Sequence, residues 1–245
     1  MSLATQGFAY KQCIRVGKTR HRWIAFIDTD EYIFVKGSTC PSLPAILPSF
    51  NSFPALGLNW VFFGSSGHNT RPTAGALNSY SKCLPSKHGV CEHVKSIVNT
   101  KYVEGLDWSS HHFTYTNGAK AVNENKVPFD GPWSRPASHN RLVLHHYFSR
   151  SREEFEQKTL RGAADGQPSK NMGDFERYNA AATENCTDGL RFWPRCCGGS
   201  NLTEDTRWLC SGVARFALQA ASGGAGAGGA GSATAGAVKP AMLRL

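Results

Sequence analysis

The sequence contains Trp23-Ile24-Ala25-Phe26-Ile27-Asp28-Thr29-Asp30-Glu31-Tyr32, a run of apolar residues that stops abruptly at three carboxylates. Apolar residues bounded by polar ones predict a strand over 23–27 that is buried on both faces. The residues that follow then lie at the carboxyl end of a strand, where open α/β folds bind their ligands.

Asp28 and Asp30 are two residues apart, so in an extended segment both side chains point to the same side. Like charges so close repel each other, and a positive group is needed to keep both ionised. A divalent cation such as Mg²⁺ or Mn²⁺ meets that need and commonly bridges to substrate phosphates. The simpler alternative is a strand followed by an acidic, solvated turn.

A second group of residues lies where an apolar segment over 141–147 reaches His145 and His146. Adjacent histidines on a strand face opposite ways, so one of them at most joins a given site. A helix is predicted from the N-cap Ser151, with Glu154 completing a capping box, towards Arg161, and Gly162 ends it. Lys158 and Arg161 are three apart and share one face of that helix.

Four further elements are expected, and with those above they indicate an α/β fold with a mixed sheet and flanking helices. They are a short helix at 8–17, a short helix around 43–47, and strands at 55–63 and 93–98. The strand at 55–63 runs into a glycine-rich loop at 64–68, which suits a close approach of the backbone to a ligand.

Composition narrows the class of protein. The 245 residues suffice for one domain or one and a half, and 27 Lys and Arg against 18 Asp and Glu give a net charge of +9. Because no block of five basic residues occurs, we expect no nucleic-acid partner. No apolar segment reaches the ~18 residues that a membrane helix needs. Residues 1–16 lack a continuous apolar core, so we expect no signal peptide there.

The eight cysteines form no C-x-x-C pair, so the sequence does not predict a zinc site. Their even number suits disulfides in an oxidising lumen, although eight buried thiols would give the same pattern. Beyond Ala220 the composition falls to Gly, Ala and Ser, which predicts a disordered tail.

Several motifs together resemble nucleotide-sugar glycosyltransferases of the A-type fold, and most of all glycosyltransferase family 92. The run at 23–32 resembles the family's W-x-x-x-x-D-x-D-E-F segment. Residues 146–162 resemble H-Y-x-x-(K/R)-S-x-x-E-F-x-x-K-x-x-R-G, residues 60–68 resemble W-x-x-F-G-S-x-G-H, residues 95–98 resemble K-S-I-V, and residues 111–113 resemble H-x-F. The resemblance covers about Phe8 to Asp188 and implies a glycosyltransferase-like domain over 1–190, a cysteine-containing extension over 191–220 and the tail over 221–245.

By that resemblance Asp28, Asp30 and His146 bind Mn²⁺ or Mg²⁺, with Asp28 shared between the metal and the ribose. Lys158 and Arg161 face the diphosphate, and Trp60 and His68 lie by the sugar and the acceptor, although a strand Trp is by default a core residue. The implied reaction transfers a hexose, galactose above all, from a UDP-sugar to a glycan or glycoprotein in the Golgi or secretory-pathway membrane.

The implied reaction inverts the anomeric centre, so it needs a carboxylate base for the acceptor hydroxyl. The candidates are Glu92, Glu104, Asp107, Glu124 and Asp130. Asp107 is preferred because it precedes Trp108 in a loop shortly before His111.

In the A-type fold the strands that bind uridine precede the two aspartates, and here only a short helix does. We therefore expect that half, and the membrane anchor and stem, to be missing, which would leave an exposed sheet edge. Two alternatives stay open: a metal-dependent phosphohydrolase or nuclease, and a catalytically inactive glycosyltransferase remnant.

Overall fold

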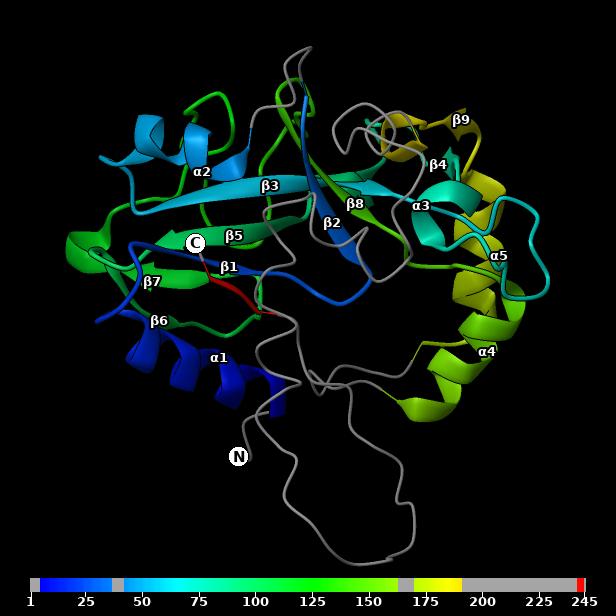
Figure 1. Ribbon diagram of the computed structural model, residues 1–245, viewed down its shortest axis with the longest axis horizontal. Helices are drawn as coiled ribbons and strands as arrows, with labels where there is room; N and C mark the ends of the chain where they lie inside the picture. Colours follow the sequence, from blue (N-terminus) through cyan, green and yellow to red (C-terminus); the bar gives the residue numbers. More distant parts are fainter. Residues whose placement is uncertain (1–4, 37–41, 163–169, 191–241, 245) are drawn as a thin grey trace, which may run out of the picture.

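A mixed sheet organises the computed structural model, which describes residues 5–36, 42–162, 170–190 and 242–244 (Figure 1). Its six strands follow the order β10-β1-β5-β3-β8-β2. Their bounds are β1 (Trp23–Phe26), β2 (Glu31–Val35), β3 (Ala55–Phe62), β5 (Val94–Asn99), β8 (Leu142–His146) and β10 (Met242–Arg244). The expected α/β class with a mixed sheet and flanking helices is confirmed.

Strands β1, β3 and β8 run in the same direction, because β3 is parallel to β8 and both β1 and β3 are antiparallel to β5. Their carboxyl ends therefore meet at one edge of the sheet. The chain crosses along this edge from β1 to β2, which lies on the far side of β8. Residues 27–30 make that crossing, so the two aspartates lie where the carboxyl ends of the parallel strands converge.

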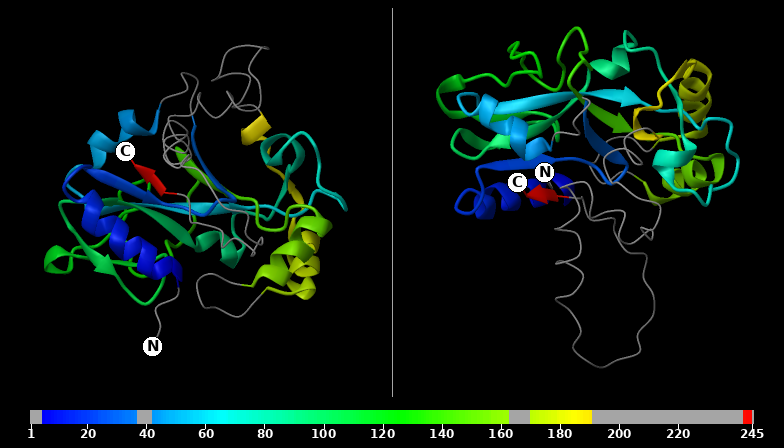
Figure 2. Two further views of the ribbon diagram at one scale, coloured as in Figure 1. Left: turned by 60° about the horizontal axis from the view of Figure 1, so that its bottom comes forward. Right: turned by 45° about the horizontal axis from the view of Figure 1, so that its top comes forward.

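Helix α1 (Thr5–Gly17) and the hairpin of β6 (Val103–Leu106) and β7 (Phe113–Tyr115) cover one face of the sheet (Figures 1 and 2). Their core includes Tyr10, Ile14, Ile24, Phe26 and Phe113, all nearly inaccessible to solvent. Gly17 lets the end of α1 approach β1, since a Cβ there would lie 2.4 Å from the side chain of Ile24.

The other face carries α2 (Leu43–Ile46) and the 3-10 turn η1 (Leu47–Phe50), which bury Leu43, Leu47 and Phe50. Helices α4 (Arg152–Arg161) and α5 (Met172–Ala181) pack against each other beyond the carboxyl ends of β3 and β8 (Figure 1). The short elements are α3 (Ala76–Ser79), β4 (Lys82–Cys83), η2 (Gly89–Glu92), η3 (Thr116–Gly118) and β9 (Glu184–Asn185).

Local sequence signals account for the helix ends. The Ser151 hydroxyl accepts from the Glu154 amide and the Glu154 carboxylate accepts from the Ser151 amide, so the expected capping box is confirmed. The helix ends at Gly162, whose φ of 74° favours glycine. Helix α5 has its own capping box, Asn171 with Asp174.

One disulfide joins Cys83 in β4 to Cys186, which follows β9. Cys91 is a buried free thiol, and burial raises its pKa to about 11. The described residues thus show both cysteine states that the sequence left open.

The C-terminal tail departs from expectation. Residues 221–241 and 245, and the extension over 191–220, lie outside the described residues. Residues 242–244, however, form β10 and pair antiparallel with β1, so part of the expected disordered tail is a strand. Pairing satisfies the free N–H and C=O groups of β1, and that edge is covered rather than exposed.

Candidate functional site

Three acidic side chains and one histidine meet at the carboxyl edge of the parallel strands. Register pairs Glu31, the first residue of β2, with His146, the last residue of β8. The imidazole therefore lies between two carboxyl groups, with Nε2 3.7 Å from Asp30 Oδ1 and Nδ1 3.9 Å from Glu31 Oε1. This contact between residues far apart in the sequence was expected for Asp30 and His146.

Two lysines offset the charge of the aspartates. Lys95, only 1% exposed, places Nζ 2.9 Å from Asp28 Oδ2 and 3.9 Å from Glu31 Oε2. Lys158 of α4 places Nζ 3.0 Å from Asp30 Oδ2 and also donates to the carbonyl oxygen of Phe148. Gln6 of α1 donates to the remaining oxygen of Asp28.

Burial and charge set the protonation states. Burial opposes ionisation of both aspartates, but Lys95 lowers the pKa of Asp28, and Lys158 with His146 holds the pKa of Asp30 well below its usual range. Burial raises the pKa of Glu31 to about 8, although Lys95 opposes the rise. Burial also lowers the pKa of His146. At neutral pH the site therefore holds two carboxylates beside a neutral imidazole.

The donor set of Asp30 and His146 fits a divalent cation. Mn²⁺ accepts carboxylate oxygen and neutral imidazole nitrogen together. The Nδ1 atom of His146 is buried, has no hydrogen-bond partner and faces the carboxyl group of Glu31. Asp28 is turned to Lys95 and Gln6, and among the described residues no group of three His, Cys, Asp or Glu side chains is arranged to hold a metal ion.

Trp60 and Glu31 support each other beneath this site. The Trp60 indole N–H donates to Glu31 Oε1 at 2.7 Å, and the Asp28 amide donates to Glu31 Oε2. Trp60 is 8% exposed, and its ring centroid lies 4.5 Å from that of His146. Of the two roles open to Trp60, the structure shows core packing.

The remaining predicted residues have other surroundings. His68 places Nε2 3.0 Å from the carbonyl oxygen of Ser79, and Arg161 is exposed in the last turn of α4. Asp107 lies after β6, and its Oδ2 is 3.1 Å from Nδ1 of His112. The structure thus brings Asp28, Asp30, His146, Lys158 and Trp60 together.

The loop at 64–68 was expected to approach a ligand, but its close contacts are with the protein itself. A Cβ on Gly64 would lie 2.7 Å from the Cβ of Ala182, so glycine lets the loop pack against the end of α5. The Ser65 hydroxyl donates to Asn179 of α5, and the Ser66 hydroxyl accepts from the amides of Ser81 and Lys82.

Sequence inspection did not identify Lys95, Glu31 and Gln6 as part of the site. Lys95 had a signal, because a lysine inside an apolar strand is rarely fully buried unless it is paired. Gln6 had none, since nothing in its neighbourhood distinguishes it from a solvated helix residue.

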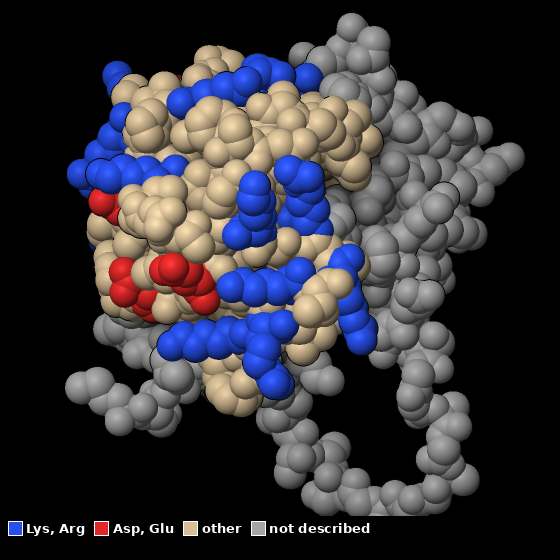
Figure 3. Space-filling model, turned by 90° about the vertical axis from the view of Figure 1, so that its left-hand side faces the viewer, with Lys and Arg blue, Asp and Glu red and all other residues tan. Residues whose placement is uncertain are grey.

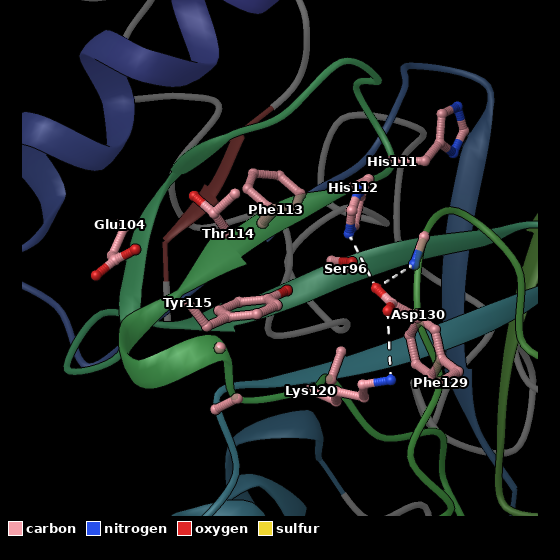
Figure 4. A pocket seen from close by; sticks show the side chains of 14 residues that line it. Ser96, Glu104, His111, His112, Phe113, Thr114, Tyr115, Lys120, Phe129 and Asp130 are labelled. Atoms are coloured by element: carbon pink, nitrogen blue, oxygen red, sulfur yellow. Dashed lines mark hydrogen bonds and ion pairs between the residues drawn. The ribbon is translucent and has the colours of Figure 1, made fainter.

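A hollow of about 400 Å³ lies behind the β6–β7 hairpin (Figure 4). His112, Lys120 and Asp130 line its polar side, with His112 Nε2 3.5 Å from Asp130 Oδ1 and Lys120 Nζ 3.3 Å from Asp130 Oδ2. Phe113, Tyr115 and Phe129 line its apolar side.

None of the described helices is long and apolar enough to cross a membrane. A comparison of the chain with protein-family models and with curated proteins found no match.

Proposed function

We propose that the chain is a metal-dependent glycosyltransferase domain of the A type, related to family 92, that binds UDP-galactose and transfers the hexose with inversion to a glycan. One observation carries the proposal. Asp30, His146 and Lys158 come from three separate segments and meet at the carboxyl edge of the sheet, as the family resemblance implies.

The metal, when bound by Asp30 and His146, would act as a Lewis acid and stabilise the negative charge of the departing nucleoside diphosphate. Lys158 is half-buried beside Asp30, so its ammonium group can donate to a phosphate oxygen. Lys95 and Gln6 hold the Asp28 carboxylate in place, and Trp60 holds Glu31 behind His146. In this proposal Asp107 accepts the proton of the attacking hydroxyl.

Calorimetric titration of UDP and UDP-galactose, with and without Mn²⁺, tests the donor site directly. We expect binding that requires the metal and that weakens beyond detection in Asp30→Ala. Glu104→Ala is the matched control, since Glu104 is an exposed carboxylate on β6, and it should bind as wild type does. Binding that ignores the metal, or that survives in Asp30→Ala, would contradict the assignment.

The nuclease alternative needs the basic surface to face the carboxylates. Figure 3 shows Lys and Arg gathered on the face that includes the C-terminal end of α1. The exposed cations of α1 and the turn after it are Lys11, Arg15, Lys18, Arg20 and Arg22. Gly17 packs on the first residues of β1, whereas Asp28 follows its last residue, so the two features lie at opposite ends of the strand. That separation favours the transferase.

The remnant alternative is distinguished by the same titration. A chain that binds neither UDP nor UDP-galactose in the presence of Mn²⁺ has the geometry of the parent site without its activity. Slow hydrolysis of UDP-galactose by the wild type, lost in Asp30→Ala, would exclude the remnant.

A further inference from the structure

A row of aromatic rings leads from the candidate metal site to the surface. The centroid distances are 4.5 Å from His146 to Trp60, 5.1 Å from Trp60 to His93, 5.6 Å from His93 to Trp133 and 6.1 Å from Trp133 to Trp108. Exposure rises along the row, since Trp60 is 8% exposed, Trp133 is half-buried and Trp108 is 65% exposed.

Trp108 is exposed although its backbone is held firmly. It lies in the turn between β6 and β7, where the Asp107 amide donates to the His112 carbonyl oxygen and the His112 amide donates to that of Ser109. His111 anchors the same turn through Nδ1, 2.8 Å from the carbonyl oxygen of Val94. Leaving so large an apolar side chain in water forgoes its hydrophobic stabilisation, and its exposed face lies beside that of the half-buried Trp133.

Trp133 is held beside it at a fixed angle. Its indole N–H donates to Nε2 of His93 at 3.0 Å, and the guanidinium carbon of Arg135 lies 5.5 Å from its ring centroid. The two indoles are tilted by 42° to each other, and together they offer a shallow apolar surface.

Exposed carboxylates border this aromatic surface. Side chains of Asp107 and Asp130 are 40% and 68% exposed, and both lie against His112, whose ring centroid is 6.1 Å from that of Trp108. Lys120 adds an ammonium group next to Asp130. The surface therefore combines flat apolar faces with paired hydrogen-bond acceptors and a donor.

We propose that Trp108 and Trp133 form the binding surface for a carbohydrate chain, which is the acceptor of the proposed transferase. A pyranose ring has an apolar C–H face that stacks on an indole and a rim of hydroxyls that donate to carboxylates. The row of rings joins this surface to the candidate metal site in four steps of 4.5–6.1 Å between centroids, and a carbohydrate chain lying along the row would carry its terminal hydroxyl towards that site. That the bound carbohydrate is the acceptor rests on the proposed function, whereas the binding of carbohydrate to this surface does not.

Two other occupants fit less well. The carboxylates of Asp107 and Asp130 repel a polyanion such as a nucleic acid. A stable protein interface buries about 1,200–2,000 Å², and among the large apolar residues of the described chain that are exposed, Trp108 is the one that joins the aromatic row.

The test measures oligosaccharide binding without metal or nucleotide. Lactose, lacto-N-neotetraose and cellotetraose serve as probes, followed by tryptophan fluorescence and calorimetry. We expect at least one tetrasaccharide to bind, and Trp108→Ala to weaken it about tenfold. Trp108→Tyr keeps an aromatic face and should restore most of the affinity. Phe8→Ala removes an exposed ring from α1 and should change nothing.

Failure of this proposal is distinguishable from failure of the proposed function. Wild-type protein that binds Mn²⁺ and UDP but no oligosaccharide overturns the carbohydrate surface alone. Equal oligosaccharide affinity in wild type, Trp108→Ala and Trp133→Ala also overturns it. Oligosaccharide binding that is lost in Trp108→Ala supports the surface even where UDP does not bind.

Discussion

At the scale of single residues, Lys95 is the group on which the acidic site depends most. It is buried in β5 with two carboxyl groups within 4 Å, so removing its charge leaves Asp28 without its main counter-charge. We expect Lys95→Met to lower the free energy of unfolding by about 3–5 kcal/mol.

Urea denaturation at pH 7 measures this loss. Lys101→Met is the control, because Lys101 is exposed in the turn after the same strand. The free energy of unfolding of this variant should stay within about 0.5 kcal/mol of the wild-type value. An equally small change in Lys95→Met would show that the Asp28 carboxylate does not depend on Lys95 for its counter-charge in the folded protein.

The proposed role of Asp107 leads to a second prediction for a single residue. Removing the charge of a catalytic base lowers turnover, whereas removing that of a surface carboxylate does not. If Asp107 accepts the proton of the acceptor, Asp107→Asn should lower kcat about 10²–10⁴-fold and leave UDP affinity unchanged. Asp130→Asn is the comparison, since both carboxylates contact His112. Wild-type turnover in Asp107→Asn would remove it from the mechanism.

At the scale of elements, patterns within a short stretch of sequence predicted the positions of strands and helices best. The apolar runs gave β1, β3, β5 and β8 nearly to the residue, and the Ser151 capping box gave the start of α4. Strand β2 was missed because it begins at Glu31, whose charge hides the apolar residues after it, and α5 because its apolar face is short.

Positions that depend on pairing between distant segments could not be predicted from local patterns. The separation of β1 from β2 by three intervening strands, which carries Asp28 and Asp30 across the sheet edge, is a property of topology. Asp30, His146 and Lys158 were placed together through a family resemblance, whereas Lys95 needed the β1–β5 register.

Glu124 fastens the segment before β8, and it makes the stability of the fold depend on pH. Its buried carboxylate accepts from the amides of Asn140, Arg141 and Leu142 and from the Ser138 hydroxyl. Burial opposes its ionisation, but these donors outweigh burial and lower its pKa. A lowered pKa contributes stability above the unfolded value of about 4.3, and that contribution is lost as the pH falls through the folded value.

We therefore expect Glu124→Gln to cost about 1–3 kcal/mol at pH 7, with the difference from wild type shrinking as the pH falls below about 4.3. Chemical denaturation between pH 7 and pH 3 gives both curves. Glu104→Gln, on the exposed side of β6, should run parallel to wild type throughout. A wild-type advantage that grew towards acid pH would reverse the assigned sign.

At the scale of the whole molecule, the Cys83–Cys186 disulfide joins two segments that are 103 residues apart. It fastens β9, which follows α5, to β4 beside the end of β3. Within the loop it closes lie β5, the β6–β7 hairpin, β8 and α4, which carry Lys95, His146 and Lys158 of the candidate site. Closing so long a loop restricts the unfolded chain more than the folded one.

Reduction should therefore destabilise the entire site and not just the short β4–β9 pair. We expect Cys186→Ala to lower the free energy of unfolding by about 2–4 kcal/mol, with UDP affinity at low temperature little changed because no site residue is touched. Dithiothreitol should lower the free energy of unfolding of the wild type by a similar amount. It should lower that of Cys186→Ala by less, because this variant has no Cys83–Cys186 bond to reduce. Cys91→Ala, at a buried free thiol, separates a packing defect from loss of the covalent link. Equal losses for Cys91→Ala and Cys186→Ala would mean that packing around sulfur, rather than loop closure, stabilises this end of the fold.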